Sequence, residues 1–380
     1  MRGTPAIAAG EDHLARSKCL SNHIDRAQQF WLQPIEIVER LLSMREARAD
    51  AFFSVPCESW HRPSLVRMMS RTQSDRESSR VIAVTGASGA VGSALCKSLT
   101  ASGDRVIRLV RGHAPLNRDE IRWDRSGAWD ASALEGLDAL VHLAGENIAA
   151  GRWTRARKAS IMQSRSIGTR TLCEKLAALS RPPAVVVSAS AVGYYGNSSV
   201  RSLDESAPPG EGFLASVARE WEASTEPLQR RNVRTVRLRI GVVVSAHSGV
   251  VAKMRLPFLC GVGGRVGSGQ QGMSWIHLDD LVAAIRFTIE TQSVHGAVNA
   301  VAPHAVSQHE FARALATALH RPCLAPLPAW AVRVLLGEMG SQLLLSGQFV
   351  EPAVLNAHGF RFACEHIDDA MRREFSPSSQ

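Results

Sequence analysis

A run of apolar residues leads directly into three evenly spaced glycines at Val81-Ile82-Ala83-Val84-Thr85-Gly86-Ala87-Ser88-Gly89-Ala90-Val91-Gly92. The pattern predicts a buried strand over Val81–Thr85, a tight turn, and a helix over Ala90–Ser102 that Gly103 closes. A strand that passes through such a loop into a helix is the context in which spaced glycines bind dinucleotides. We therefore expect a dinucleotide-binding loop here.

Each glycine of this loop has its own physical reason. Gly86 suits the tight turn that leaves the strand, Gly89 lets the backbone approach a pyrophosphate, and Gly92 permits close packing of the helix against the strand. The unpaired amides and the dipole at the start of the helix favour the charge of a diphosphate. The expected cofactor contacts in the loop are Gly86, Ala87, Ser88, Gly89, Ala90, Val91 and Gly92.

Short apolar strands alternate with helical segments beyond this loop. Strands are expected at Arg105–Val110, Asp138–Ala144, Ala184–Ser190 and Val233–Val244, and helices at 153–179 and 214–230. This alternation predicts an α/β fold of the Rossmann type, with a doubly wound parallel sheet between two layers of helices. We expect the NAD(P)-binding Rossmann domain to span 80–245. A smaller C-terminal, substrate-side lobe is expected over 246–375 and folds back onto that domain.

Residues 1–79 lack the strand–helix alternation of the following chain. They are expected to form an N-terminal extension that is partly helical or poorly ordered. Apolar residues recur at near-helical spacing over 26–49, and the polar run over 70–79 is typical of a linker. Met68 and Met69, just before that run, are alternative start positions. We assign no chemistry to this extension.

Composition excludes several classes of protein. The 44 Lys and Arg residues against 35 Asp and Glu give a net charge of +9, but no basic run is interleaved with aromatic residues, so no nucleic-acid partner is expected. The seven cysteines form no Cys-x-x-Cys pair, which indicates reduced thiols rather than a disulfide framework or a zinc ribbon. Apolar stretches fall short of the roughly 20 residues of a membrane span, and no secretory signal is seen. We expect a cytoplasmic protein without a membrane partner, and leave its oligomeric state open.

The end of the second predicted strand favours NADP over NAD. In this fold an Asp or Glu at that position accepts from the ribose 2′-hydroxyl of NAD, whereas an Arg accommodates the 2′-phosphate of NADP. The chain reads Val106-Ile107-Arg108-Leu109-Val110-Arg111-Gly112, without an acid. Arg111 is placed to pair with the phosphate, although a solvated arginine at a strand end is the alternative. We expect NADP as the cofactor, with NAD as the second choice.

Five separated motifs resemble the YfcH-like "epimerase family" proteins, a divergent branch of the extended and atypical short-chain dehydrogenases/reductases. Besides the glycine loop, they are Val141–Ile148 with the following 152–154 and 164–169, Ser188–Gly196, Gly272–Asp280, and a tail over 337–362 that is similar to that family's small C-terminal domain of unknown function. The resemblance covers about 80–375. It implies a Rossmann fold with cofactor contacts at the glycine loop, at Arg111 and at Leu143, Ala144 and Gly145. Ser188, at the end of a predicted strand, is added to these contacts.

The chain lacks the Tyr-x-x-x-Lys pair that ordinary members of this superfamily use. In that pair the tyrosine exchanges a proton with the substrate hydroxyl, and the lysine one helical turn later stabilises the phenolate. The chain has only two tyrosines, Tyr194 and Tyr195, and neither has a lysine four residues on. Our alignment places Phe213 at the tyrosine position and Val217 at the lysine position.

Two interpretations of function follow. In the first, the protein is an NADP-dependent oxidoreductase or epimerase-like enzyme that acts on a hydroxyl/carbonyl pair of a small molecule. Ser190 polarises the substrate oxygen and Tyr194 or Tyr195 handles the proton; a nucleotide-sugar substrate is implied by the family alone. In the second, catalysis is weak or lost, and the chain is an NADP-binding regulatory protein, for example one related to cell division. Packing is the alternative role of the tyrosines, and capping of a turn is that of the serines.

Several further residues are candidates for contacts with ligands. Glu146 and Asn147 follow a predicted strand end, where ligands gather in a doubly wound sheet. Candidate substrate contacts are also Arg152, Trp153 and Trp275. The group His277, Asp279 and Asp280 has the spacing of a helix start that Asp279 caps, rather than of a metal site, so no metal is expected.

Overall fold

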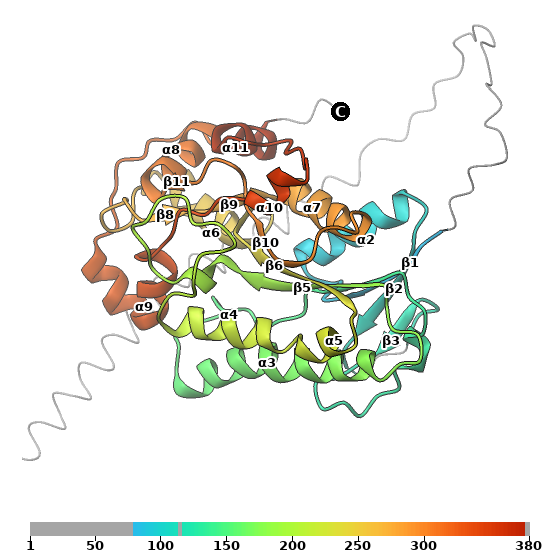
Figure 1. Cartoon of the computed structure of the whole chain (residues 1–380). Coiled ribbons are helices and arrows are strands. Elements are labelled where there is room, and N and C mark those ends of the chain that lie inside the picture. The colour runs from blue at the N-terminus through green and yellow to red at the C-terminus, as the bar shows by residue number, and fades with distance from the viewer. Residues whose placement is uncertain (1–78, 113–115, 377–380) are drawn as a thin grey trace, which may run out of the picture. The chain divides into compact units, whose positions relative to one another are not determined.

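The computed structural model describes residues 79–112 and 116–376, and the predictions for the N-terminal extension lie outside these ranges. Seven parallel strands form one central sheet between two layers of helices (Figure 1). In spatial order the strands are β10 (Gly296–Ala300), β6 (Arg234–Ile240), β5 (Val185–Ala191), β4 (Ala139–His142), β1 (Val81–Thr85), β2 (Arg105–Val110) and β3 (Glu120–Arg122). The predicted Rossmann-type, doubly wound fold is confirmed.

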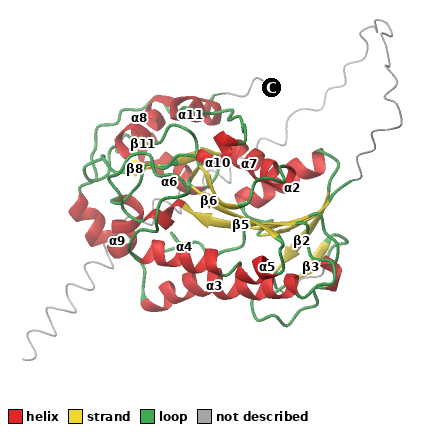
Figure 2. Ribbon diagram, in the orientation of Figure 1, coloured by secondary structure: helices red, strands yellow, loops and turns green. Residues whose placement is uncertain are grey.

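Alternate side chains of each strand enter two separate cores. Ile82 and Val84 of β1 pack with α2 (Ala90–Ala101) and α7 (Leu278–Glu290), whereas Ala83 between them faces the opposite layer. That layer contains α3 (Arg155–Ala177), α4 (Phe213–Ala223) and α5 (Glu226–Arg230), as Figure 2 shows. Because helices cover both faces, the central strands are apolar on both sides.

The order of strands reverses between β1 and β4. β1 pairs with β2 on one side and with β4 on the other, so the crossover helices leave in opposite directions from this point. In open parallel sheets ligands bind outside the carboxyl ends of the strands at such a switch point. The glycine loop and the residues Leu143–Gly145 both lie there.

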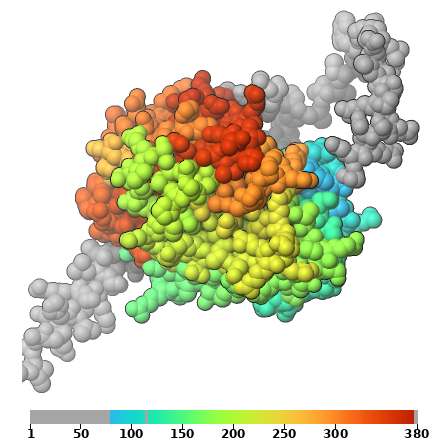
Figure 3. Space-filling view, viewed as in Figure 1, coloured from blue at the N-terminus to red at the C-terminus, as the bar shows by residue number. Residues whose placement is uncertain are grey.

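The second half of the chain builds a C-terminal lobe and also completes the sheet. The lobe contains α6 (Gly249–Leu259), α8 (Gln308–Ala318), α9 (Ala329–Leu344) and α11 (Ile367–Phe375), together with the short pairs β7 (Val242–Val244) with β9 (Trp275–His277) and β8 (Gly272–Met273) with β11 (Val306–Ser307). However, α7, β10 and α10 (Ala353–Ala357), which also lie beyond residue 245, cover or extend the main sheet. In Figure 3 the orange and red residues of this half lie directly against the yellow-green segment near residue 200. That contact includes hydrogen bonds from Leu203 N to Phe349 O and from Glu351 N to Leu203 O, of 2.9 and 2.8 Å.

The predicted bounds of β1 and β2 are confirmed, whereas two longer predicted elements are divided. The helix expected over 214–230 is two helices, because a turn with Pro227 in the first turn of α5 separates them. The strand expected over Val233–Val244 breaks at Gly241, where a Cβ atom would lie 2.6 Å from the Ser274 carbonyl oxygen. The short strand β3 and the 3-10 turns η1 (Ser132–Leu134) and η2 (Val192–Tyr195) were not predicted.

Within the described ranges, every helix is too short or too polar to cross a membrane.

Candidate functional site

The glycine loop leaves β1 in a geometry that only glycine allows at two positions. Gly86 has a φ of +70°, and a Cβ atom there would lie 2.9 Å from the carbonyl carbon of Leu143. A Cβ on Gly92 would lie 2.2 Å from the Gly86 carbonyl oxygen, so α2 can approach the loop only without a side chain there. The contact at Gly86 brings the loop against the residues that follow β4, and the contact at Gly92 brings α2 against the loop.

The start of α2 is open to an anion. Gly89 is its N-cap residue, and among the described residues no side chain accepts a hydrogen bond from the amides of the first turn. Ser88, Gly89 and Ala90 are exposed, and the first turn contains no acid. Free amides and the positive end of the helix dipole therefore face solvent at the switch point, which is the arrangement that binds a diphosphate.

A buried histidine fixes the end of β4 relative to the loop. The Thr85 hydroxyl accepts from the amides of Leu143 and Ala144, at 3.1 and 3.2 Å, and lies 2.8 Å from Nδ1 of His142. Since the hydroxyl oxygen already accepts twice, its proton points to Nδ1, and Nε2 carries the proton that faces the Thr169 hydroxyl at 3.0 Å. Burial lowers the pKa of His142 to about 4, so the ring is neutral at physiological pH.

Arg111 lies where the sequence places it, just past the end of β2. Its side chain is exposed and makes no hydrogen bond or ion pair with any residue of the described ranges. Gly112 follows with a φ of +94°. Among the described residues, the guanidinium therefore has no partner that would compete with a ligand.

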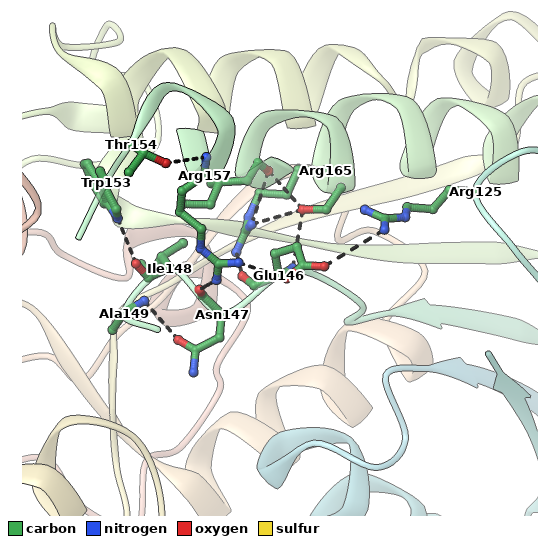
Figure 4. A network of polar contacts seen from close by, with 11 residues as sticks. Arg125, Glu146, Asn147, Ile148, Ala149, Trp153, Thr154, Arg157 and Arg165 are labelled. Atoms are coloured by element: carbon green, nitrogen blue, oxygen red, sulfur yellow. Dashed lines mark hydrogen bonds and ion pairs between the residues drawn. The ribbon is translucent and has the colours of Figure 1, made fainter. Parts of the chain in front are cut away.

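The loop after β4 is held by arginines from the neighbouring elements (Figure 4). Arg165 of α3 donates to the carbonyl of Glu146 at 2.9 Å, and burial lowers its pKa to about 10. Arg157 lies 3.4 Å from the Glu146 carboxylate and also donates to the carbonyl of Asn147, whereas Arg125 is 3.9 Å from the same carboxylate. Glu146 and Asn147 are thus part of the structure that shapes this loop, because the Glu146 carboxylate pairs with arginines and both oxygens of Asn147 accept hydrogen bonds. Gly145, just before them, leaves room for the Arg165 guanidinium, which would lie 3.3 Å from a Cβ.

Ser190 does not face an open site. The residue is 3% exposed, and its hydroxyl donates to Glu222 of α4 at 2.8 Å. Glu222 also forms a bidentate pair with Arg239 of β6, with distances of 2.8 and 3.0 Å. Burial alone lowers the pKa of Arg239, but the Glu222 carboxylate outweighs it and raises that pKa above its ordinary value. The three side chains form one buried polar group between the sheet and α4.

Tyr195 belongs to the same buried group, whereas Tyr194 lies at its edge. The Tyr195 hydroxyl accepts from Arg239 at 2.9 Å and donates to Asn299 at 2.7 Å. Burial raises the pKa of Tyr195 to about 12 despite the nearby arginine. Tyr194 is partly exposed, with its ring 3.5 Å from the Arg239 guanidinium carbon, and its hydroxyl has no hydrogen-bond partner among the described residues. Ser188, two residues before Ser190, is likewise buried at 2% exposure.

The position at which the tyrosine of the usual pair is expected lies at the start of α4. Phe213 is the first residue of that helix, and its ring meets Trp153 edge to face with centroids 5.0 Å apart. Val217 is buried. Two groups that the sequence did not single out lie beside Phe213: the Lys158 ammonium, 4.7 Å from the ring centroid, and Glu338, 2.8 Å from that ammonium.

The group His277, Asp279 and Asp280 holds the C-terminal segment. Nε2 of His277 lies 3.0 Å from the Glu374 carboxylate, Asp279 pairs with Arg373 at 2.8 Å, and Asp280 accepts from the amides of residues 363 and 364. The prediction that Asp279 caps the helix is wrong: His277 is the N-cap residue, and its Nδ1 accepts from the Asp279 amide at 3.2 Å. Asp279 is the second residue of the helix after the cap, and an N-cap side chain commonly accepts from the amide at that position.

One trio in the described ranges combines imidazole and carboxylate ligand atoms within 4.8 Å of one another: His304, Glu365 and His366, all exposed. The two imidazoles stack face to face, with centroids 4.4 Å apart and an angle of 7° between planes. Because their lone pairs lie in parallel planes, they do not converge on one ion. Trp275 is fully buried and donates to the His304 carbonyl at 3.0 Å, so it does not line an open site.

Comparison with known proteins gives consistent matches along the described chain. A model of the NAD-dependent epimerase/dehydratase family matches residues 82–301, and a model of a domain of unknown function matches 327–374. An epimerase family protein of Mycobacterium bovis is 42% identical over 292 residues, which are 77% of this chain and 96% of the relative.

Solved structures agree with these matches. The human epimerase family protein SDR39U1 (isoform 2), crystallised with NADPH, is 33% identical with a TM-score of 0.71, over 77% of this chain and 98% of that one. A nucleoside-diphosphate sugar epimerase from Corynebacterium glutamicum is 31% identical with a TM-score of 0.65, over 78% of this chain and 58% of that one.

Proposed function

We propose, from the premise that the chain belongs to the NAD-dependent epimerase/dehydratase family, that it is an NADP-dependent oxidoreductase or epimerase-like enzyme acting on a hydroxyl/carbonyl pair. The family resemblance predicted from the motifs is confirmed by these matches. The observation that carries the proposal is the open start of α2 beside Gly86 and Gly92, at the point where the strand order reverses. The human relative that binds NADPH supports the choice of cofactor.

Specific residues fit each part of the dinucleotide. The amides of Ala87, Ser88 and Ala90 are available to hold the diphosphate, whereas the Gly89 amide donates to the Gly86 carbonyl at 3.0 Å. Gly89 adds no side chain between the backbone and the phosphate oxygens. Arg111 is the group for the 2′-phosphate, because its planar guanidinium has no other partner among the described residues. The chain segment Leu143, Ala144 and Gly145, which Thr85 and His142 fix, forms the opposite wall of this site. Ser188 is buried and supports that wall from within the sheet.

The bound cofactor supplies or accepts a hydride at its nicotinamide ring. The residues of the chain orient that ring, exclude water and manage the proton of the substrate oxygen. Ser190 and Tyr195 support β5 and η2 through Glu222 and Arg239, since their hydroxyls already bond within the protein. Of the three predicted catalytic side chains, only Tyr194 keeps a hydroxyl without a partner in the described part of the chain.

A nucleotide-sugar substrate rests on the names of relatives, such as the Corynebacterium epimerase, and we propose only a small molecule with a hydroxyl or carbonyl group. The test is to measure NADPH binding by fluorescence and NADPH oxidation by absorbance with a panel of aldehydes and ketones. We expect binding and slow oxidation with at least one compound. Tight binding without oxidation across the panel would contradict the enzymatic function.

That negative outcome would favour the second candidate, an NADP-binding regulatory protein. One observation supports it: Phe213 has no proton to give, and Val217 has no charge, at the positions of the usual catalytic pair. A regulatory protein requires that the cofactor alter its structure or its contacts. Hydrogen exchange with and without NADPH measures such a change, and regulation predicts altered protection outside the glycine loop.

A further inference from the structure

The start of α4 holds Phe213, at the position where the catalytic tyrosine of the superfamily is expected. Phe213 opens this helix next to η2, and a Cβ on Gly193 of η2 would lie 3.5 Å from the Cβ of Leu214. Because η2 directly follows β5, Phe213 lies near the carboxyl edge of the central strands. This is the region in which a doubly wound sheet binds its ligands.

Lys158 brings an ammonium group to this phenyl ring from the neighbouring helix α3. Its Nζ is 4.7 Å from the centroid of Phe213 and lies 2.8 and 3.0 Å from the two carboxylate oxygens of Glu338. The lysine side chain is 33% exposed, so solvent still reaches it. Lys175, the other lysine of α3, instead donates to the carbonyl of Trp129.

Helix α9 of the C-terminal lobe is held in the position that the ion pair between Lys158 and Glu338 requires. Gly337, just before Glu338, has a φ of +60° and interrupts the helix. Arg152 donates to the carbonyls of Val334 and Leu335, at 3.1 and 3.3 Å, which precede the break. One turn later, the Gln342 side chain accepts from the amide of Leu214 at 3.3 Å. Glu338 is therefore held against α3 and α4 by contacts on both sides of it.

We propose that Lys158 is the proton donor to the substrate oxygen, and that Glu338 is the residue that positions it. The proposal rests on the proposed oxidoreductase function. In the reductive direction, the carbonyl carbon gains the hydride of NADPH, and the π electrons of the carbonyl pass to its oxygen. That oxygen takes one proton from the Lys158 ammonium, which leaves an alcohol, NADP⁺ and a neutral amine. The amine regains its proton from solvent.

An ammonium is chemically suited to replace the absent phenol. The ordinary pKa values of lysine and tyrosine side chains are about 10.4 and about 10, so the two groups are acids of similar strength. A lysine has three N–H donors, and the two oxygens of Glu338 leave at least one of them for a substrate oxygen.

The test compares four variants of the full chain: Lys158→Met, Lys158→Arg, Glu338→Gln, and the control Lys97→Met, which changes an exposed lysine on α2. For each, NADPH affinity, melting temperature and the turnover of a carbonyl compound reduced by the wild type are measured. We expect unchanged NADPH affinity throughout and about a 100-fold or larger loss of turnover for Lys158→Met. Lys158→Arg is expected to keep the ion pair and the melting temperature but to lose turnover similarly, because a guanidinium is a much weaker acid.

Glu338→Gln gives a further readout. In cofactor-free protein, reductive methylation of Lys158, followed by peptide mass spectrometry, is expected to be faster in Glu338→Gln than in the wild type. The methylation rate of Lys97 serves as the internal reference.

The outcomes separate this proposal from the function on which it rests. A wild type that binds NADPH and reduces nothing overturns the proposed enzyme and, with it, the proton donor. A wild type that turns over while Lys158→Met or Lys158→Arg keeps more than half of that activity overturns only the role of Lys158. Equal methylation rates in Glu338→Gln and the wild type overturn the positioning role of Glu338.

Discussion

The hydroxyl of Ser190 donates to the carboxylate of Glu222 across 2.8 Å, in the buried interior between β5 and α4. A serine at the end of this strand is expected to polarise a substrate oxygen, but here its proton is already bound by a carboxylate that also pairs with Arg239. The contact favours a structural role for Ser190. The proton chemistry of the site then falls to other groups. These are Tyr194 and, beside the start of α4, Lys158 of α3 with Glu338 of α9.

The buried pair of Glu222 and Arg239 is expected to be important for stability. Glu222→Gln leaves the arginine charge without its partner in the interior and is expected to lower the free energy of unfolding by about 3–5 kcal/mol. Ser190→Ala removes one hydrogen bond to the same carboxylate and is expected to cost about 1–3 kcal/mol, with turnover reduced less than tenfold. Urea unfolding and kinetics measure these effects. If Ser190→Ala abolishes turnover without loss of stability, the serine is catalytic after all.

His142 predicts a pH dependence of stability. Its pKa is about 4 in the folded protein, because burial disfavours the charged ring, and about 6.5 when unfolded. Between these values the unfolded state binds more protons, so stability falls as the pH decreases from about 6.5 towards about 4. The full loss is about 3 kcal/mol.

The matched variant His142→Gln lacks this titration. The stability difference between wild type and variant is therefore expected to shrink by about 3 kcal/mol between pH 7 and pH 4. Denaturant unfolding at several pH values provides the comparison. A difference that stays constant over this range means that the ring is not held neutral by burial.

Substitution of two glycines of the loop by alanine is expected to have different effects on stability and on cofactor binding. Gly92→Ala forces a methyl group against the Gly86 carbonyl oxygen, 2.2 Å away. This substitution is expected to destabilise the fold by about 1–3 kcal/mol and also to weaken cofactor binding. Gly89→Ala has more room, with that carbonyl 3.3 Å from the added carbon, but places a methyl group where the diphosphate approaches. We expect a nearly normal melting temperature and at least tenfold weaker NADPH binding. Unchanged NADPH affinity in Gly89→Ala would place the diphosphate elsewhere.

Arg111 is expected to discriminate between the two nicotinamide dinucleotides. A charge-assisted hydrogen bond contributes about 1.5–3 kcal/mol. Arg111→Ala is therefore expected to weaken the binding of NADPH by about 10- to 100-fold and to change the binding of NADH little. Titrations of both cofactors against wild type and variant measure the preference. Equal losses for the two cofactors mean that Arg111 does not contact the 2′-phosphate.

The sequence predicted the first β-α-β unit well because its signals are local. The strand Val81–Thr85, the glycine spacing and the strand Arg105–Val110 each depend on residues a few positions apart, and the structure confirms their bounds. The break between β6 and β7 at Gly241 depends instead on contact with Ser274, which is distant in sequence. No local pattern therefore predicted it. The cap at His277 was missed because histidine is an uncommon N-cap residue and Asp279 a common one.

The candidate site likewise has one part that depends on local sequence signals and one part that does not. The cofactor-binding part is a continuous motif, and the spacing of its glycines predicts it. The pairs Ser190–Glu222 and Lys158–Glu338 join residues that are 32 and 180 positions apart, and neither spacing is periodic. The only sequence signal for the second pair is the scarcity of lysine, since Lys158 is one of five in the chain. The two tyrosines are scarcer still, yet packing around Arg239 explains where they lie.

The most direct test of the central claim is isothermal titration calorimetry of the full chain with NADPH and with NADH. The claim is that the backbone around Gly86–Gly92 binds a dinucleotide with Arg111 selecting the 2′-phosphate. We predict saturable heat for NADPH at one site per chain, weaker binding of NADH, and loss of both signals in Gly89→Ala at the same concentrations. No binding of either cofactor to correctly folded wild-type protein would contradict the account.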